Sequence, residues 1–119
     1  MHCRARTADE TDWKEIASLY AILEALRATP AVRVNRAFAL SRVRGAAAGL
    51  ALLGDGTIAV ESYPYFHLVK GTLLGELGEV GEARRELLAA AESARNEPER
   101  AQIRRRIAEL ENMPVQSEI

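Results

Sequence analysis

The stretch GTLLGELGEVGEARRELLAA, residues 71–90, decides the fold of this chain. Its leucines and alanines recur at three- and four-residue steps, which is the spacing of one face of an α-helix. Glycines in the middle interrupt that spacing, and glycine is the residue that most often ends a helix. The stretch therefore predicts a helical hairpin, in which one helix ends at Leu77 before Gly78 and a second helix runs from Glu82 to about Arg95.

Matching residues lie 34 positions earlier in the chain. The pairs are Ala37 with Gly71, Leu40 with Leu74, Gly49 with Ala83 and Leu53 with Leu87. A 34-residue period with small residues where two antiparallel helices cross is that of the tetratricopeptide repeat, although His67 stands where that repeat usually has tryptophan. We therefore predict an all-α fold of about six helices, built as a right-handed stack of antiparallel helix hairpins.

Capping signals place the other helices. Asp12 with Glu15 and Asn96 with Glu99 form capping-box patterns, and Pro30 suits the first turn of a helix. The expected helices span residues 12 to about 27, 30–43, 46–53, 64–77, 82–95 and 96–111. The loop that opens at Gly54 is long for a compact helical protein, so it is either mobile or functional. We predict a single domain over residues 1–119, with frayed ends at 1–10 and 112–119.

The amino-acid composition limits the classes of protein to which the chain can belong. The 119 residues suffice for one domain, and 48% hydrophobic with 28% charged residues is typical of globular proteins. A net charge of -1 provides no overall attraction to nucleic acid or to a membrane, and no apolar run reaches the length of about 18 residues that spans a bilayer. The single cysteine, Cys3, cannot form an internal disulfide. We expect a soluble, cytoplasmic domain.

Candidate catalytic residues are hard to find in this sequence. Gly54-Asp55-Gly56 lacks the lysine and the serine or threonine of a phosphate-binding loop, and no nucleophile stands beside a base. His67 is either a general base or metal ligand or, as we expect, a structural histidine at a helix crossing. We therefore predict no enzyme, no metal and no cofactor.

Three consecutive arginines, Arg104–Arg106, form either a phosphate-binding cluster or a solvated helix face. Successive residues on a helix are rotated by about 100°, so the three side chains do not share one stripe. We expect the solvated face. A nucleic-acid-binding domain that uses these arginines stays a weaker alternative, which salt-dependent DNA binding would reveal.

Tetratricopeptide stacks bind partners through the inner face of the first helix of each unit. In the repeat frame this face holds Val34, Phe38, Ser41 and Arg42, followed by Tyr65, Leu68, Thr72 and Glu76. Several of these residues are apolar, so either the first helix of the chain covers them or they await a partner segment. The mid-helix polar residues Asn35 and Arg36 either tie helices together or line a groove.

Several short motifs agree in order and spacing with one bacterial family. They are Thr11-Asp12-Trp13 with Ile16, Leu19 and Tyr20, then Pro30, Asn35-Arg36-Ala37, Gly45 and Gly49, Phe66-His67, Leu73-Leu74 before Leu77-Gly78, and Asn96-Glu97-Pro98-Glu99-Arg100. On these residues, from about residue 4 to residue 111, the chain resembles the C-terminal, tetratricopeptide-like extension of a group of extracytoplasmic-function RNA polymerase sigma factors. The motif positions are Asp12, Trp13, Tyr20, Pro30, Asn35, Arg36, Gly49, His67, Gly71, Gly78 and Ala83.

The resemblance implies a non-catalytic interaction or regulatory domain in transcription initiation, which contacts other sigma-factor regions, RNA polymerase or a regulator. Nothing in the chain resembles the promoter-reading regions, so we expect it to bind neither nucleic acid nor a membrane directly. The start at Met1, within what is a helix in the family, predicts a fragment, and an in-phase coding sequence upstream of Met1 would decide this. The alternative is a free-standing scaffold or adaptor, with a homodimer as one option.

Overall fold

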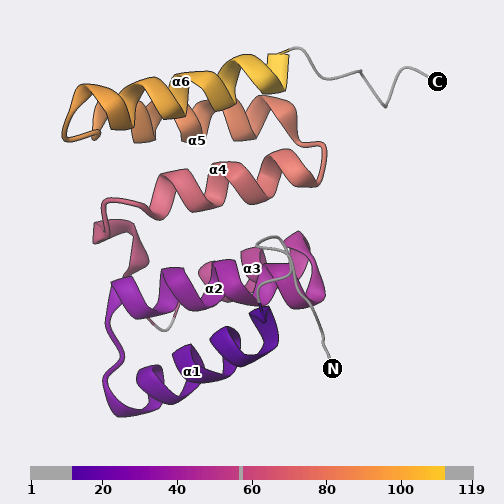
Figure 1. The fold of residues 1–119 in the computed structure, drawn as a ribbon, viewed down its shortest axis with the longest axis vertical. Coiled ribbons are helices and arrows are strands. Elements are labelled where there is room, and N and C mark those ends of the chain that lie inside the picture. Colours follow the sequence, from indigo (N-terminus) through magenta and orange to yellow (C-terminus); the bar gives the residue numbers. More distant parts are fainter. Residues whose placement is uncertain (1–11, 57, 112–119) are drawn as a thin grey trace.

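The computed structural model describes residues 12–56 and 58–111, and these residues form six α-helices and a short 3-10 helix (Figure 1). The α-helices are α1 (Trp13–Leu26), α2 (Pro30–Arg44), α3 (Ala46–Leu53), α4 (Phe66–Glu76), α5 (Val80–Glu92) and α6 (Glu97–Glu111), and the 3-10 helix is Val60–Ser62. No strand occurs in these residues, so the predicted all-α class is confirmed. The expected frayed ends and Cys3 lie outside the described residues.

Side-chain caps begin three of the helices; those at Asp12 and Asn96 were predicted, and the one at Thr29 was not. The carboxylate of Asp12 accepts a hydrogen bond from the backbone N–H of Glu15 at 3.2 Å, and the hydroxyl of Thr29 accepts one from Val32 at 3.1 Å, with Pro30 in the first turn. The side chain of Asn96 accepts a hydrogen bond from the N–H of Glu99 at 2.9 Å. Each bond satisfies a backbone donor that has no partner within its own helix.

Two glycines with a positive φ make the turns inside the hairpins. Gly45 (φ 99°) separates α2 from α3, and Gly78 (φ 84°) separates α4 from α5. After α4, the N–H of Glu79 bonds to the carbonyl of Leu74 at 3.0 Å and that of Gly78 to Gly75 at 3.0 Å, which is the Schellman pattern of a helix end. This closes the turn within three residues, so α5 begins at Val80, earlier than the predicted Glu82.

Two other boundaries differ from the prediction for identifiable reasons. Pro64 lies in a turn closed by a 3.0 Å hydrogen bond from the N–H of Phe66 to the carbonyl of Tyr63, so α4 begins at Phe66 and not at Pro64. At the end of α5, the N–H of Arg95 bonds to the carboxylate of Glu99 at 2.8 Å. Since that N–H is used by α6, α5 ends at Glu92 instead of Arg95.

The helices of each hairpin approach closely where the sequence has small residues. A Cβ atom added to Gly49 in α3 would lie 2.7 Å from the carbonyl oxygen of Ala37 in α2. A Cβ atom added to Gly71 in α4 would lie 2.8 Å from Cγ of Leu87 and 3.2 Å from the carbonyl oxygen of Ala83, both in α5. The four small residues that define the 34-residue match are therefore the contact points of the two hairpins.

Each helix packs against the next one along the chain, and α4 lies in the middle of the molecule (Figure 1). Leu73 and Leu74, two adjacent residues of α4, point into two different cores. Leu73 joins residues of α2 and α3, among them Val34 and Leu53, whereas Leu74 joins residues of α5 and α6. The side of the molecule formed by α2, α4 and α6 is the front in Figure 1, with α3 and α5 behind.

None of the helices in the described ranges has both the length and the hydropathy needed to cross a membrane.

Candidate functional site

A groove runs over α4 between α2 and α6. Its central section has a volume of about 400 Å³. The residues that line this section are Asn35, Phe38 and Arg42 from α2, Tyr63 and Tyr65 from the segment before α4, Leu68, Val69, Thr72 and Glu76 from α4, and Arg106 from α6. A concave surface with apolar walls and a few polar groups is the usual form of a ligand site.

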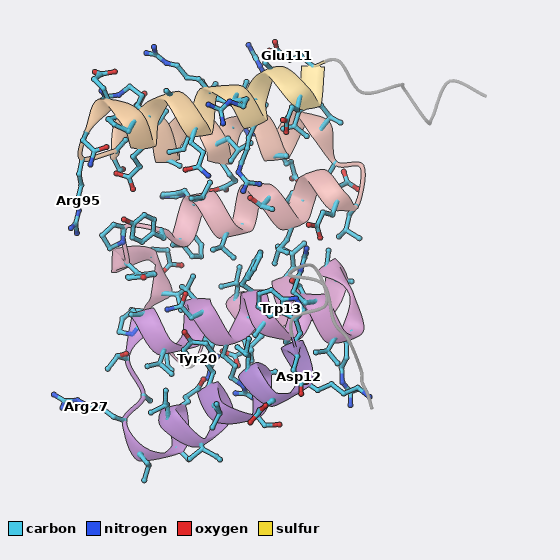
Figure 2. All side chains as sticks on the ribbon, in the orientation of Figure 1. Asp12, Trp13, Tyr20, Arg27, Arg95 and Glu111 are labelled. Carbon is cyan, nitrogen blue, oxygen red and sulfur yellow. The ribbon has the colours of Figure 1, made fainter. Side chains whose placement is uncertain are left out.

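The groove continues beyond both ends of this section. Tyr65 and Leu68 also border a hollow of about 540 Å³ toward the start of α6, where Figure 2 shows Arg95 at the turn from α5 to α6. Thr72, Glu76 and Arg106 also border a hollow of about 230 Å³ toward Leu110. Because neighbouring sections share residues, they form one continuous surface along α4, here named the α4 groove.

Six of the eight residues that the repeat frame assigned to a partner-binding face line the central section of the α4 groove. They are Phe38, Arg42, Tyr65, Leu68, Thr72 and Glu76. The prediction was wrong for the other two residues, because Val34 is fully buried and Ser41 is only 5% exposed. Val34, Ala37 and Ser41 are spaced as one stripe of α2, and Ala37 and Ser41 lie against Gly49 of α3. That stripe therefore faces the partner helix of the hairpin and is closed to another molecule.

The first helix does not cover the groove. It touches the groove wall at one point, where the Trp13 ring packs edge-on against Phe38 with ring centroids 5.6 Å apart. Figure 2 shows Trp13 at the start of α1. Tyr20 is half-buried on the same helix. No residue of α1 lines any of the three sections, so among the described residues the first helix does not cover the apolar inner face.

Residues one repeat apart contact each other across the groove. The guanidinium of Arg42 in α2 lies 2.5 Å from the carboxylate of Glu76 in α4, and it also lies over the ring of Phe38 at 4.8 Å. Tyr65 bonds through its side chain to Glu99, and this hydrogen bond raises the pKa of Tyr65 above its usual value. Both pairs are separated by 34 residues, the period read from the sequence.

The groove contains polar side chains whose hydrogen-bonding groups are unused within the described residues. Asn35 on α2 and Gln102 on α6 line it from opposite sides, and neither side-chain amide bonds to another described residue. Arg36, the neighbour of Asn35, lies 3.3 Å from the carboxylate of Glu24 in α1. Of the two roles expected for this polar pair, Asn35 lines the groove and Arg36 ties two helices together.

Arg106 belongs to the groove and was missed by sequence reasoning. Arg104, Arg105 and Arg106 are all exposed, but Arg106 is the one of the three that lines the central section. It forms no ion pair with any residue in the described part of the chain. The signal that could have found it is the period itself, because Phe38, Thr72 and Arg106 are spaced by 34 residues.

A buried ionic cluster holds α1 and the turn after α3 to α2. The guanidinium of Arg33, 6% exposed, bonds to both carboxylate oxygens of Glu24, to Asp55 at 2.6 Å and to the carbonyl of Leu52 at 3.2 Å. These hydrogen bonds hold the pKa of Glu24 below its usual value and raise that of Arg33. No sequence pattern predicted this cluster, because its members come from α1, α2 and the turn after α3.

His67 belongs to α4, and its side chain contacts α5. Its Nδ1 atom is 2.6 Å from the carboxylate of Glu86, and the ammonium group of Lys70 is 3.5 Å from the same carboxylate. The contact places His67 at the crossing of α4 and α5. In the part of the chain that the structure describes, no three His, Cys, Asp or Glu side chains gather as metal ligands would.

A second exposed surface lies on α1. Its residues Leu19, Ile22, Leu23 and Leu26 are 53%, 56%, 47% and 79% exposed, and they are spaced as one face of the helix. From the three- and four-residue spacing of Trp13, Ile16, Tyr20, Leu23 and Leu26, the sequence predicts one apolar packing stripe on this helix. The structure corrects this for Leu23 and Leu26, because α1 has no buried residue and these two leucines are exposed to solvent.

Comparison with known proteins gives one relative of unassigned function. The uncharacterized protein R00370 of Rhizobium meliloti (strain 1021) is 39% identical to the chain over 114 residues, which is 96% of this chain and 27% of that protein. The chain therefore spans about a quarter of the length of this relative. No family model and no solved structure matches the chain.

Proposed function

We propose that the fold is a tetratricopeptide-like, right-handed stack of helix hairpins, with α2–α3 and α4–α5 as consecutive units and α6 as the first helix of a third. Two observations support this. Small residues mark the helix crossing of both hairpins at positions 34 apart, and side chains 34 apart pair across the groove. In the third unit the small-residue position holds Arg105, an exposed charged residue that suits the solvated end of a stack.

We infer that the chain is a non-catalytic, cytoplasmic interaction domain of an RNA polymerase sigma factor. It acts through protein–protein contact with other sigma-factor regions, RNA polymerase or a regulator. The observation that carries this proposal is the α4 groove, an open surface with apolar walls that gathers six residues chosen from the sequence as partner-binding. The much greater length of the Rhizobium meliloti relative fits a domain that works within a larger protein.

The test is transcription by a full-length sigma factor that carries this domain. Phe38→Ala and Leu68→Ala together remove two apolar side chains, one from α2 and one from α4, that line the central section. We expect promoter-dependent RNA synthesis to fall by about ten-fold, as expected when apolar contacts at the centre of an interface are lost. Circular dichroism and thermal unfolding of the isolated chain report whether the variant is folded.

A matched control is Leu88→Ala, which removes an exposed leucine of α5 that does not line any section of the α4 groove. We expect the control to transcribe like the unchanged sigma factor. Full transcription by a folded Phe38→Ala/Leu68→Ala variant would remove the groove from the mechanism.

A second candidate is a free-standing, homodimeric adaptor. The exposed apolar face of α1 favours it, because four large apolar side chains on one helix face resemble half of a helix–helix interface. Sedimentation equilibrium of the chain with and without Ile22→Asp distinguishes the candidates. A dimer that this substitution converts to a monomer would support the adaptor, and a monomer at all concentrations would exclude it.

A further inference from the structure

We propose that the α4 groove binds a short extended peptide segment that carries a large apolar side chain close to an acidic one. This rests on the proposed function, because it specifies the chemistry of the partner at the same site. Four features of the groove carry it: its length, its apolar side chains, and amide groups and an arginine that have no partner among the described residues.

The length of the groove suits a short linear segment. Its floor follows α4 and the residue before it from Tyr65 to Glu76, which at 1.5 Å per residue is about 16 Å. An extended chain advances about 3.3 Å per residue, so about five residues fill this length. Both ends are open, because the groove continues past Tyr65 and past Glu76.

The central section has an apolar surface that can contact a side chain of the partner. Phe38 from α2 and Leu68 from α4 line it, and Tyr65, 36% exposed, borders it toward α6. A leucine or aromatic side chain of a partner would bury its own apolar surface and that of these residues, and such anchors provide most of the energy of an interface.

Amide groups stand on both walls. Asn35 in α2 and Gln102 in α6 line the groove and make no side-chain hydrogen bond to another described residue. A side-chain amide has both a donor and an acceptor, which is the complement of a peptide group. An extended backbone between the walls offers unpaired N–H and C=O groups to such amides, whereas a helix has already used its own.

The charge of the central section selects an acidic partner residue. It contains Arg42, Arg106 and Glu76, and Arg42 is already paired with Glu76. The guanidinium of Arg106, without an ion pair among the described residues, is left to bind a carboxylate. Glu109 lines only the next section, so the acidic preference belongs to the partner position that faces Arg106.

The experiment is selection from a phage-displayed library of random peptides of about ten residues against the full chain. Three targets are used: the unchanged chain, Arg106→Glu and Arg105→Glu. Arg105 is the matched control, because it is the neighbouring exposed arginine on α6 and does not line the groove. We expect the unchanged chain and Arg105→Glu to select peptides with Asp or Glu near Leu, Phe or Trp, and Arg106→Glu to select Lys or Arg in place of the acidic residue.

Affinities of one selected peptide, labelled with a fluorophore, complete the test. We expect about ten-fold weaker binding to Arg106→Glu, a loss of about three-fold for Asn35→Ala, and no change for Arg105→Glu. Equal weakening by both arginine variants, or selected peptides without an acidic residue, would overturn the acidic partner while leaving the groove as a binding site. A library that yields no binder to the unchanged chain would overturn the peptide proposal. The proposed function is tested separately by the transcription experiment described above.

Discussion

At Gly49 and Gly71 a larger residue would collide with the neighbouring helix. At Gly49 the nearest atom to an added Cβ is the carbonyl oxygen of Ala37, which belongs to the backbone of α2 and cannot rotate away. At Gly71 the nearest atoms belong to the side chain of Leu87, which has rotamers available. The two crossings therefore differ in how well they tolerate a larger residue.

We expect Gly49→Ala to lower the free energy of unfolding by about 2 kcal/mol, because the helices must separate to admit the methyl group. Gly81→Ala is the control, since an added Cβ there meets no atom within 4 Å and α5 gains a better helix former. Urea unfolding should show Gly81→Ala at or slightly above the stability of the unchanged chain. Equal stability of Gly49→Ala and Gly81→Ala would mean that the α2–α3 crossing is looser than described.

The Arg33 cluster is a second feature at which a single substitution should change stability. Arg33 and Glu24 have side chains that are 7% and 13% exposed, so removing either charge leaves the other one poorly solvated. We expect Arg33→Met, which keeps the volume, to lower the free energy of unfolding by about 3 kcal/mol. Arg36→Met removes a more exposed partner of the same carboxylate, 31% exposed, and should cost less than about 1 kcal/mol. Similar losses from the two variants in urea unfolding would contradict a special role for Arg33.

The same cluster makes stability depend on pH. Hydrogen bonds from Arg33 hold the pKa of Glu24 in the folded chain below its usual value of 4.5, so the unfolded chain takes up a proton first as the pH falls. The stabilising contribution is complete above about pH 4.5 and is lost as the pH falls through the folded-state pKa. Urea unfolding between about pH 5 and pH 3 should therefore show a smaller loss of stability in Glu24→Gln than in the unchanged chain. A parallel loss in both proteins would show that Glu24 titrates normally.

At the scale of elements, α1 differs from the other five helices. It has no buried residue and is held by Glu24 and by the contact of Trp13 with Phe38. By contrast, α2 and α3 contribute buried residues to one core, α5 and α6 contribute them to the other, and α4 contributes to both. The stability of α1 is thus set by ionic bonds more than by apolar burial, and it is the helix most able to open without the rest of the fold.

Hydrogen–deuterium exchange followed by mass spectrometry should show this difference. We expect the amides of α1 to exchange faster than those of α2, α4 and α5, and Arg33→Met to accelerate exchange in α1 more than elsewhere. Equal protection of α1 and α4 would contradict the weak attachment of α1.

The sequence predicted elements well where local signals define them. Asp12, Thr29-Pro30, Gly45 and Gly78 mark helix ends by caps or a positive φ, and the structure has a boundary at each of them. Boundaries set by distant residues were missed. α5 ends early because Arg95 bonds to Glu99, and nothing near Glu92 records that interaction.

The candidate site was predictable to the extent that the repeat fixes a helix face. The 34-residue frame located six groove residues, but it could not decide how α2 is rotated against α3, which is why Val34 and Ser41 were placed on the wrong side. Arg33 and Glu24 form a cluster only because α1 folds back over α2. Interactions of that kind depend on how helices are arranged, and local sequence patterns do not contain them.

At the scale of the whole molecule, the fold serves to place equivalent residues beside one another. α2, α4 and α6 lie on one side of the molecule (Figure 1). Side chains from these three helices, several of them 34 residues apart, line the α4 groove. The central claim is that this side, and not the side formed by α3 and α5, meets the partner.

Under the proposed assignment to a sigma factor, site-specific photo-crosslinking in the full-length protein tests this claim most directly. A benzophenone amino acid replaces Gln102, an exposed residue in the groove wall, or Arg85, an exposed residue of α5. On irradiation with RNA polymerase, we expect an adduct to polymerase or to another sigma-factor region from position 102 and none from position 85. Adducts from position 85, with none from position 102, would contradict the groove as the partner-binding surface.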